Sequence, residues 1–283
     1  MSVVSSIKRD YIYKLANDGK RVDDRKFDEY RPIKIETGII SKAEGSARVK
    51  IGNTQVVAGI KMGIGEPYPD SPDKGVMMTA AELIPLASPD FESGPPRKNA
   101  IELARVVDRG IRESEVIGLD KLCMEPGEKI WLVFIDIHII DFDGNLFDAA
   151  SLAALAALFD ATVPIERLRP ALEKLQEKFP SIKNYLEEHP KDYQLPMNEP
   201  PISCTSVKFN DVIVLDPSLD EEEIAEARLT VATDKNEDIR AMQKGLNGVF
   251  TVDEIKNIIK TSVDNSAKIR RMLEEVVKKK RNH

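Results

Sequence analysis

Cysteine and histidine are scarce in this chain of 283 residues, which has two cysteines and three histidines. Cys123 and Cys204 lie far apart, form no C-x-x-C pair and do not cluster with the histidines. A structural zinc site needs a closed set of nitrogen and sulfur ligands, which this chain cannot supply. The sequence therefore predicts two reduced, partly buried thiols and no metal or other cofactor.

Long apolar runs are also absent. No segment approaches the roughly 20 apolar residues that a membrane-spanning helix needs. Residues 1–20 contain no apolar stretch followed by a small-residue cleavage site, so they do not resemble a signal peptide. We therefore expect a chain without a membrane partner and with a cytoplasmic location.

The chain lacks an overall positive charge. It has 41 Lys and Arg against 48 Asp and Glu, a formal net charge of −7. A protein that binds nucleic acid over its whole surface is usually basic. Any polyanion must therefore be bound at a local site, or at a site shared with a partner. Hydrophobic residues make up 42% of the chain, which is enough for a well-buried core.

Along the chain, segments with a strand pattern alternate with segments with a helix pattern. Gly52-Asn53 separates two runs with alternating apolar residues, which predicts a β-hairpin over 45–67. Residues 147–164 are apolar around most of a helix circumference, which predicts a buried central helix. Further strands are predicted from residue 77, over 127–145, on both sides of an Asn-Asp turn in 203–223, and over 226–234. Further helices are predicted over 100–116, 165–178 and 251–277.

Repeated prolines in 179–202 separate two parts, each of which runs from strands to helices. This order predicts an α+β fold, in which mixed sheets pack on helices in two similar lobes. The predicted organisation is an N-terminal helical arm (1–30), a first lobe (31–180), a Pro-rich connection (181–202) and a second lobe with a C-terminal helix (203–283).

The segment IELARVVDRGIRE (101–113) places Arg105, Arg109 and Arg112 along one stripe of a predicted helix. Asp108 and Glu113 lie mostly off this stripe, so no carboxylate run faces the arginines. Two interpretations are open. The arginines form a solvated face with partners from other elements, or they form a ladder of guanidinium groups that grip phosphates bidentately.

Five segments, in order, resemble the RNase PH family of phosphorolytic exoribonucleases. They are GKRVDDRKFDEYRPI, GSARVKIGNTQVVAGIK, KNAIELARVVDRGIR, IDIHIIDFDGNLFDAASLAALAAL and VLDPSLDEEEIAEARLTVA. The likeness is strongest to the non-catalytic RNase PH-like subunit of the archaeal exosome ring. It implies an RNase PH-like fold with two β-α-β lobes, and a ring of three heterodimers with a catalytic RNase PH-like subunit. It also implies RNA-binding cap subunits and single-stranded RNA in the central channel.

Active subunits of this family carry two carboxylates six residues apart, in a pattern like E-D-x-x-G-x-A-D. Here the matching stretch EEEIAEAR places Glu222 at the first carboxylate, Ala225 at the glycine and Arg228 at the second carboxylate. The phosphate-binding Gly-Thr-Arg or Gly-Ser-Arg of active subunits is also replaced, because residues 144–148 read Gly-Asn-Leu-Phe-Asp. An apolar group and an acid are then expected where phosphate would bind. The resemblance thus implies no catalytic residue, with Glu222 and Arg228 as degenerate catalytic positions.

The arginine stripe has a role in the same resemblance. Residues that match Arg105 and Arg109 reach toward the active site of the neighbouring catalytic subunit and contact the RNA backbone near its 3′ end. Arg112 lies on the same stripe and is included as an RNA-binding residue. The stripe is then expected to lack carboxylate partners in its own chain, because RNA phosphates are its counter-ions.

Two other functions remain open. The chain could be an independently active phosphate-dependent 3′-to-5′ exoribonuclease that uses Glu222 with Asp216 or Asp220, or a spacer without RNA contact. His138 lies beside Asp136 on a predicted strand, but neither a third member of a catalytic triad nor a nucleophile is visible. A hydrogen-bonded strand histidine is the favoured interpretation.

Overall fold

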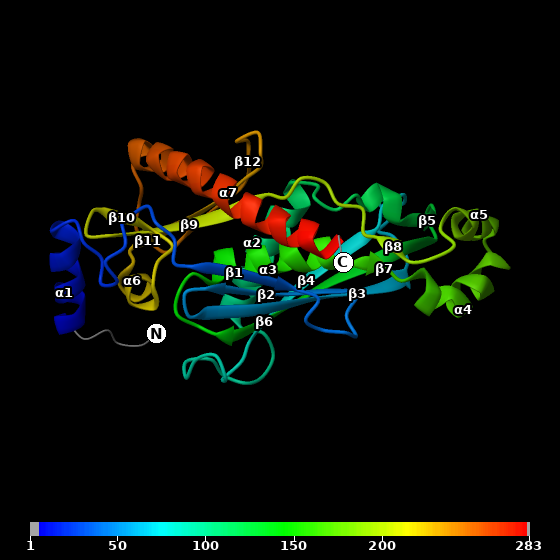
Figure 1. Ribbon diagram of the computed structural model, residues 1–283, viewed down its shortest axis with the longest axis horizontal. Helices are drawn as coiled ribbons and strands as arrows, with labels where there is room; N and C mark the ends of the chain where they lie inside the picture. The colour runs from blue at the N-terminus through cyan, green and yellow to red at the C-terminus, as the bar shows by residue number, and fades with distance from the viewer. Residues whose placement is uncertain (1–5, 282–283) are drawn as a thin grey trace.

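The computed structural model describes residues 6–281 (Figure 1). The molecule is elongated, with helix α1 (Ser6–Asn17) at one end and helices α4 (Ile165–Gln176) and α5 (Pro180–Glu188) at the other. A layer of helices lies against a large sheet on one side and a smaller sheet on the other. Within the described residues, no helix combines the length and the apolar character needed to cross a membrane.

The larger sheet has the strand order β1-β2-β3-β6-β4, with β5 paired to β6. Its strands are β1 (Ile33–Thr37), β2 (Gly45–Ile51), β3 (Thr54–Gly65), β4 (Val76–Leu83), β5 (Cys123–Glu125) and β6 (Lys129–Asp141). Strand β4 runs parallel to β6, and helix α2 (Lys98–Glu113) makes the crossover between them. A short 3₁₀ helix, η1 (Leu119–Leu122), precedes β5. This sheet is therefore mixed, and β4-α2-β6 is a β-α-β unit.

The predicted hairpin is confirmed. Strands β2 and β3 pair antiparallel with Ile51 opposite Thr54, and Gly52-Asn53 forms the two-residue turn. Strand β6 lies within the strand predicted over 127–145, and one of its faces is buried throughout. The buried residues of that face are Trp131, Val133, Ile135, Ile137 and Ile139. The period of two thus orients this sheet against the helix layer.

Helix α3 (Leu146–Asp160) is the predicted central helix. Almost all of its side chains are buried, because β2 and β3 pack on one side and β9 (Ile202–Phe209) packs on the other. Alanine and leucine on every face allow contact with both layers. The helix begins immediately after Gly144-Asn145, so its N-terminus lies where the two sheets approach each other (Figure 1).

The smaller sheet has the order β10-β9-β11-β12 and is antiparallel throughout. It contains β9, β10 (Val212–Leu215), β11 (Ala227–Thr233) and β12 (Ile239–Gly245), with helix α6 (Leu219–Ile224) between β10 and β11. The strand, Asn-Asp turn and strand predicted in 203–223 are confirmed as β9 and β10. Strand β12 was not predicted, because this edge strand has no regular buried face.

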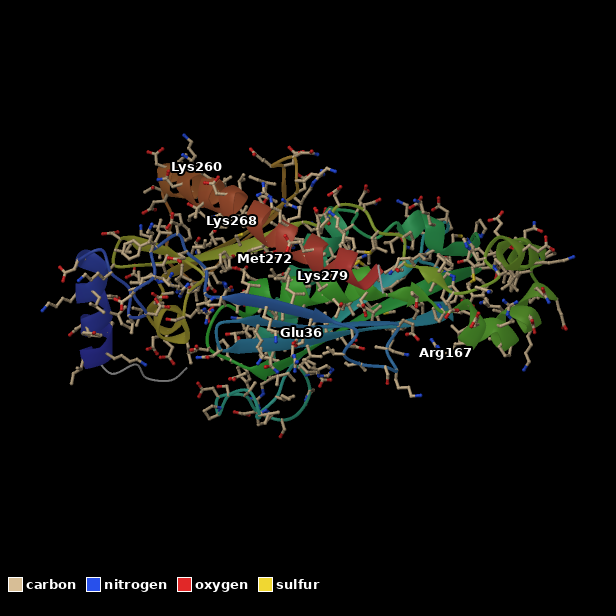
Figure 2. The ribbon with its side chains drawn as sticks, viewed as in Figure 1. Glu36, Arg167, Lys260, Lys268, Met272 and Lys279 are labelled. Carbon is tan, nitrogen blue, oxygen red and sulfur yellow. The ribbon has the colours of Figure 1, made fainter. Side chains whose placement is uncertain are left out.

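Helix α7 (Val252–Arg281), the helix predicted over 251–277, begins with a capping box between Thr251 and Glu254. It packs against β1, β9 and β11 through an apolar stripe that includes Ile258, Ile269 and Leu273. Met272 lies at the solvent-facing edge of this helix and is 44% exposed. Figure 2 shows it between Lys268 and Lys279 on the outer side of the helix.

The remaining elements join the ends of the two sheets. Helix α1 packs through Ile12 and Ala16 against residues of β9, β10 and α6. Helix α5 occupies the first part of the predicted Pro-rich connection, and β7 (Thr162–Val163) pairs with β8 (Tyr193–Gln194) around α4 and α5. The predicted division into an arm, two lobes and a connection stays a prediction.

Candidate functional site

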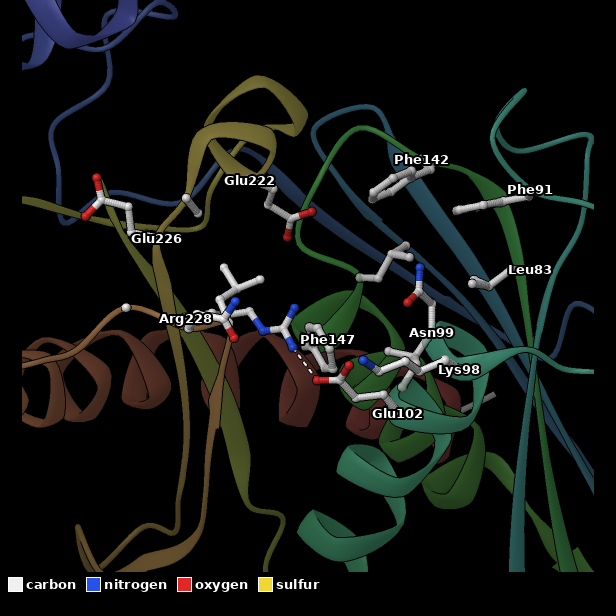
Figure 3. A pocket seen from close by; sticks show the side chains of 16 residues that line it. Leu83, Phe91, Lys98, Asn99, Glu102, Phe142, Phe147, Glu222, Glu226 and Arg228 are labelled. Atoms are coloured by element: carbon white, nitrogen blue, oxygen red, sulfur yellow. Dashed lines mark hydrogen bonds and ion pairs between the residues drawn. The ribbon is translucent and has the colours of Figure 1, made fainter. Parts of the chain in front are cut away.

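A cavity of about 900 Å³ opens where the first turns of α2 and α3 face α6 and β11 (Figure 3). Both halves of the chain contribute to it, including the turn after β12. Its lining combines apolar and charged side chains, of which the charged ones are Lys98, Glu102, Glu222, Glu226 and Arg228. The two predicted degenerate positions, Glu222 and Arg228, therefore meet in one cavity.

The N-terminus of α3 is held against the segment that leads into α6. Gly144 has φ +87°, and a Cβ there would lie 2.5 Å from the carbonyl oxygen of Pro217, so the approach of the two segments requires glycine. Asn145 donates through its backbone N–H to Oε1 of Glu222 at 2.9 Å. Its side-chain amide donates to Oδ1 of Asp216 at 2.7 Å. These contacts use groups that could otherwise bind an anion at a helix N-terminus.

Phe147 and Asp148 lie in the first turn of α3 and have different surroundings. Phe147 lines the cavity, as expected for the apolar group at this place. Asp148 is buried instead, and accepts hydrogen bonds from Tyr30 Oη at 2.6 Å and from Thr205 Oγ1 at 2.7 Å. The expectation that an acid faces the cavity here is thus wrong for Asp148, because its carboxylate joins the two halves of the chain. Burial raises the pKa of Asp148 to about 6.

Glu222 faces the cavity from α6 (Figure 3). Burial raises its pKa to about 7, although the Asn145 N–H and the positive charges of Arg228 and Arg31 favour the ionised form. Near neutral pH this carboxyl group is therefore divided between its protonated and ionised forms.

Arg228 reaches into the same cavity from β11. Its Nη2 donates to Oε1 of Glu102 on α2 at 2.5 Å. Its guanidinium carbon lies 4.0 Å from the centre of the Phe147 ring, which is cation–π contact. A guanidinium at this place repels a divalent cation, so the donor set does not suit a metal-dependent carboxylate pair. Within the described residues, no group of three or more His, Cys, Asp or Glu is placed to hold a metal ion.

The two acids considered as partners of Glu222 do not line the cavity. Asp216 is fully buried and accepts from the backbone N–H, Nε and Nη2 of Arg31 at 2.8–2.9 Å. Asp220 forms an ion pair with Lys8 on α1. The structure therefore gives Glu222 neither of these two acids as a catalytic partner.

The predicted arginine stripe lies on α2 beside this cavity. Arg105, Arg109 and Arg112 are exposed and line a groove of about 410 Å³ between α2 and β4. The groove is also lined by small residues: Ala80, Ala81, Pro96, Ala100 and Ala104. The structure thus brings the three arginines together along one groove that has no aromatic side chain in its lining.

The three arginines differ in their partners. Arg112 donates through Nε and Nη2 to the two carboxylate oxygens of Asp108, each at 3.0 Å. The expectation that the stripe lacks a carboxylate partner is therefore wrong for Arg112, because Asp108 lies one turn away on the same side of the helix. Arg109 donates to Oε1 of Gln243 on β12 at 3.2 Å. Among residues 6–281, Arg105 has no hydrogen bond or ion pair.

His138 lies away from both the cavity and the groove. It stands opposite Glu82 in the β4–β6 register, with Nδ1 at 3.4 Å from Oε2 of Glu82. This contact lies on the sheet surface, and His138 lines neither the cavity nor the groove.

Comparison with known proteins identifies the family. Residues 29–164 match the 3′ exoribonuclease family (RNase PH), domain 1, and residues 199–265 match domain 2 of the same family. The chain belongs to the RNase PH family. The exosome complex component Rrp42 of Methanocella arvoryzae is 55% identical over 274 residues, which cover 97% of this chain and 98% of that protein. The predicted membership of the RNase PH family is confirmed.

Solved structures agree with this assignment. A chain of the Archaeoglobus fulgidus exosome with RNA bound to the active site matches with a TM-score of 0.85 and 47% identity, over 94% of this chain and 97% of that one. A chain of an archaeal exosome core matches with a TM-score of 0.82 and 43% identity, over 95% and 96%. The predicted RNase PH-like fold is therefore confirmed.

The RNase PH segment GKRVDDRKFDEYRPI has a structural role that its sequence does not reveal. Arg21 pairs with the buried Glu221 of α6 through Nε at 2.9 Å and Nη2 at 2.6 Å. It also donates to the carbonyl oxygens of Leu215 and Asp216, each at 2.9 Å. With Arg31, it fixes the segment that presents Glu222 to the cavity.

Sequence reasoning also missed Glu102 as the partner of Arg228. The two residues are 126 positions apart, and no local pattern links them. The available signal was an unexplained acid one turn before Arg105 on a helix otherwise notable for its arginines.

Proposed function

We propose that the chain is a non-catalytic subunit of an archaeal exosome core ring, which binds single-stranded RNA and completes the phosphorolytic site of a catalytic RNase PH-like partner. The observation that carries this proposal is Arg228. A guanidinium, paired with Glu102 and stacked on Phe147, fills the place where active family members carry the second carboxylate. The names of the exosome relatives support the role in the same complex.

The chemistry of the cavity supports the absence of catalysis by this chain. Phosphorolysis needs an attacking phosphate held by free donors and groups that assist proton transfer or bind a metal. Here the N–H of Asn145 already donates to Glu222, and the ring of Phe147 occupies the lining in front of α3. Of the two positions at which active family members carry a carboxylate, the one at Glu222 keeps an acid and the one at Arg228 does not.

The groove on α2 supports contact with the RNA backbone. Arg105 and Arg109 are exposed, and neither has a carboxylate partner within residues 6–281. Guanidinium groups grip phosphate oxygens bidentately. Because small aliphatic side chains line the groove instead of aromatic ones, it suits phosphates better than stacked bases.

The assembly is part of the proposal. We assign the chain to a ring of three heterodimers with the catalytic subunit, with RNA-binding cap subunits on the ring, and to the cytoplasm. These assignments rest on the sequence resemblance and on relatives that are named exosome components.

The test is release of nucleoside diphosphates from a short single-stranded RNA in phosphate buffer. The chain is measured alone and then titrated into a fixed amount of the catalytic subunit. We expect no release by the chain alone, and activity that rises to a plateau at equimolar mixing. Robust release by the chain alone would overturn the proposal, and Glu222 would then be the first residue to substitute.

A further inference from the structure

We infer that Arg228 is a positioning residue for RNA binding, because it fixes helix α2 at the turn that carries Arg105. The inference rests on the proposed function, since it concerns the RNA contact of the arginine stripe. Its basis is a set of contacts around Arg228 that join the hairpin β11–β12 to α2.

The first contact is the ion pair with Glu102. Arg228 is on β11, and its Nη2 lies 2.5 Å from Oε1 of Glu102 (Figure 3). The Arg228 and Glu102 side chains are only 15% and 32% exposed, so water screens this pair less than the surface pairs. Glu102 precedes Arg105 by three residues, which places both in one helical turn. A shift of Glu102 therefore moves Arg105 with it.

The second feature is the space that Gly245 leaves for the guanidinium. Gly245 on β12 stands opposite Arg228 in the β11–β12 register. A Cβ at Gly245 would lie 2.6 Å from Nη2 and 3.0 Å from Cζ of Arg228. The side chain of Arg228 thus crosses the neighbouring strand at a place that only glycine leaves open. A Cβ at 245 would therefore require the guanidinium to shift, and we expect this shift to weaken its contact with Glu102.

The third feature is how few groups hold Arg228. Phe147 of α3 packs against its guanidinium, and Nε is buried with no hydrogen-bond partner. An orphaned buried N–H has a cost in free energy. Arg228 is therefore directed at Glu102 and the Phe147 ring, and is not part of a general hydrogen-bond network.

A second contact between the same hairpin and α2 lies on the other side of Arg105. Gln243 of β12 accepts a hydrogen bond from Arg109 at 3.2 Å. Arg105 lies three residues after Glu102 and four residues before Arg109. The hairpin thus contacts α2 on both sides of Arg105, which has no partner of its own within the described residues and is left open to RNA. Holding a binding group in its bound geometry lowers the entropy lost on binding.

The test is a double-mutant cycle in the ring assembled with the catalytic subunit. Binding of a fluorescent single-stranded oligoadenylate is measured for Arg228→Met, for Arg105→Ala with Arg109→Ala, and for the combination. We expect Arg228→Met to weaken binding by about three- to tenfold in the parent and to have no effect once the two arginines are removed. Arg228→Lys should recover part of the loss, because it restores a positive charge toward Glu102.

Gly245→Ala provides an independent variant that leaves every charge in place. It should weaken RNA binding about as much as Arg228→Met, because it displaces the guanidinium without removing it. If Arg228→Met does not fold, Gly245→Ala still tests the inference. Lys235→Met is the matched control, since it breaks an ion pair with Glu199 outside the cavity and the groove.

Hydrogen–deuterium exchange of the full chain without RNA separates this inference from the proposed function. We expect faster exchange over residues 98–113 in Arg228→Met and Gly245→Ala, and unchanged exchange there in Lys235→Met. Unchanged exchange over residues 98–113 in Arg228→Met and Gly245→Ala would overturn the inference that Arg228 fixes helix α2. Faster exchange with no RNA effect of Arg105→Ala and Arg109→Ala would overturn the RNA role and the proposed function. If Arg228→Met weakens RNA binding equally with and without the two arginines of the stripe, Arg228 does not act through them, and the inference is wrong.

Discussion

Single charges decide what the cavity can do. Glu222 and Arg228 face the same space, and the positive charge of Arg228 opposes the rise in the pKa of Glu222 that burial causes. Because burial prevails, Glu222 titrates near neutral pH. The carboxyl group of Glu222 therefore lies in the field of a nearby guanidinium, whose positive charge would repel a divalent cation at this place.

This raised pKa predicts a pH-dependent stability. The pKa of Glu222 is about 7 in the folded chain against 4.5 in its ordinary state, so ionisation opposes folding. The favourable contribution is complete below about pH 4.5 and is lost as the pH rises through 7. At pH 8, Glu222→Gln should therefore unfold at a temperature roughly 2–4 °C above that of the wild type.

Thermal unfolding at pH 5 and pH 8 checks this prediction. The difference in unfolding temperature between Glu222→Gln and the wild type should be smaller at pH 5 than at pH 8. The variant should still lose some stability as the pH rises, because the raised pKa of Asp148, about 6, has the same effect on a smaller scale. Glu226→Gln, an exposed carboxylate of the same cavity, is the matched control. A gain that is equal at both pH values would contradict the assignment to Glu222.

Asp108 gives a second prediction at the scale of one residue. It neutralises Arg112 and places a negative charge beside the groove. Asp108→Asn should release Arg112 for RNA and strengthen RNA binding by the assembled ring about two- to threefold. Equilibrium binding to a short RNA measures the effect. Glu113→Gln removes the same charge from the same helix, so an equal gain in both variants would show a general charge effect without release of Arg112.

At the scale of elements, the segment around Arg21 positions α6. Two arginines of this segment, Arg21 and Arg31, pair with the buried acids Glu221 and Asp216 on either side of the turn into α6. A buried carboxylate that loses its partner is costly, because its charge is neither solvated nor compensated. The RNase PH segment near the N-terminus thus keeps Glu222 in place from a distance in sequence.

Arg21→Met should lower the free energy of unfolding by roughly 3–5 kcal/mol. Denaturation with urea measures this loss. The double variant Arg21→Met with Glu221→Gln should recover much of it, since no uncompensated charge remains. Arg271→Met, an exposed arginine on α7, should change the stability little. Similar losses of unfolding free energy in Arg21→Met and Arg271→Met would contradict the role of the buried Arg21–Glu221 pair.

The elements also show what the sequence could predict. Local patterns predict the β2–β3 hairpin, the central helix α3 and the C-terminal helix α7, because turn residues and periodicity act within one segment. Strand β12 lacks such a pattern, and the Arg228–Glu102 pair joins residues 126 positions apart. The Asp108–Arg112 pair is local, but it forms because both side chains are long enough to meet across one helical turn even though Asp108 lies beside the stripe. The charge of the site was thus predictable, and its contacts across the fold were not.

At the scale of the whole molecule, the arginine groove has a charge opposite to that of its chain. The net charge of −7 repels RNA at long range, whereas Arg105 and Arg109 attract phosphates at short range. Salt screens both effects over about 10 Å at 0.1 M. RNA binding is thus expected to depend on the assembled ring, where other subunits contribute to the electrostatic field.

The salt dependence of RNA binding therefore gives a test of the groove in the intact assembly. Arg109→Ala should weaken RNA binding by the ring without dissociating it, because the residue is exposed and contacts only Gln243 within the described chain. Each phosphate contact with single-stranded nucleic acid contributes about 0.7 to the slope of log K against log salt. The slope should fall by about this amount in Arg109→Ala and stay unchanged in Arg271→Ala, which removes the same charge from α7. An intact slope in Arg109→Ala, with native mass spectrometry confirming the ring, would place the RNA phosphates elsewhere.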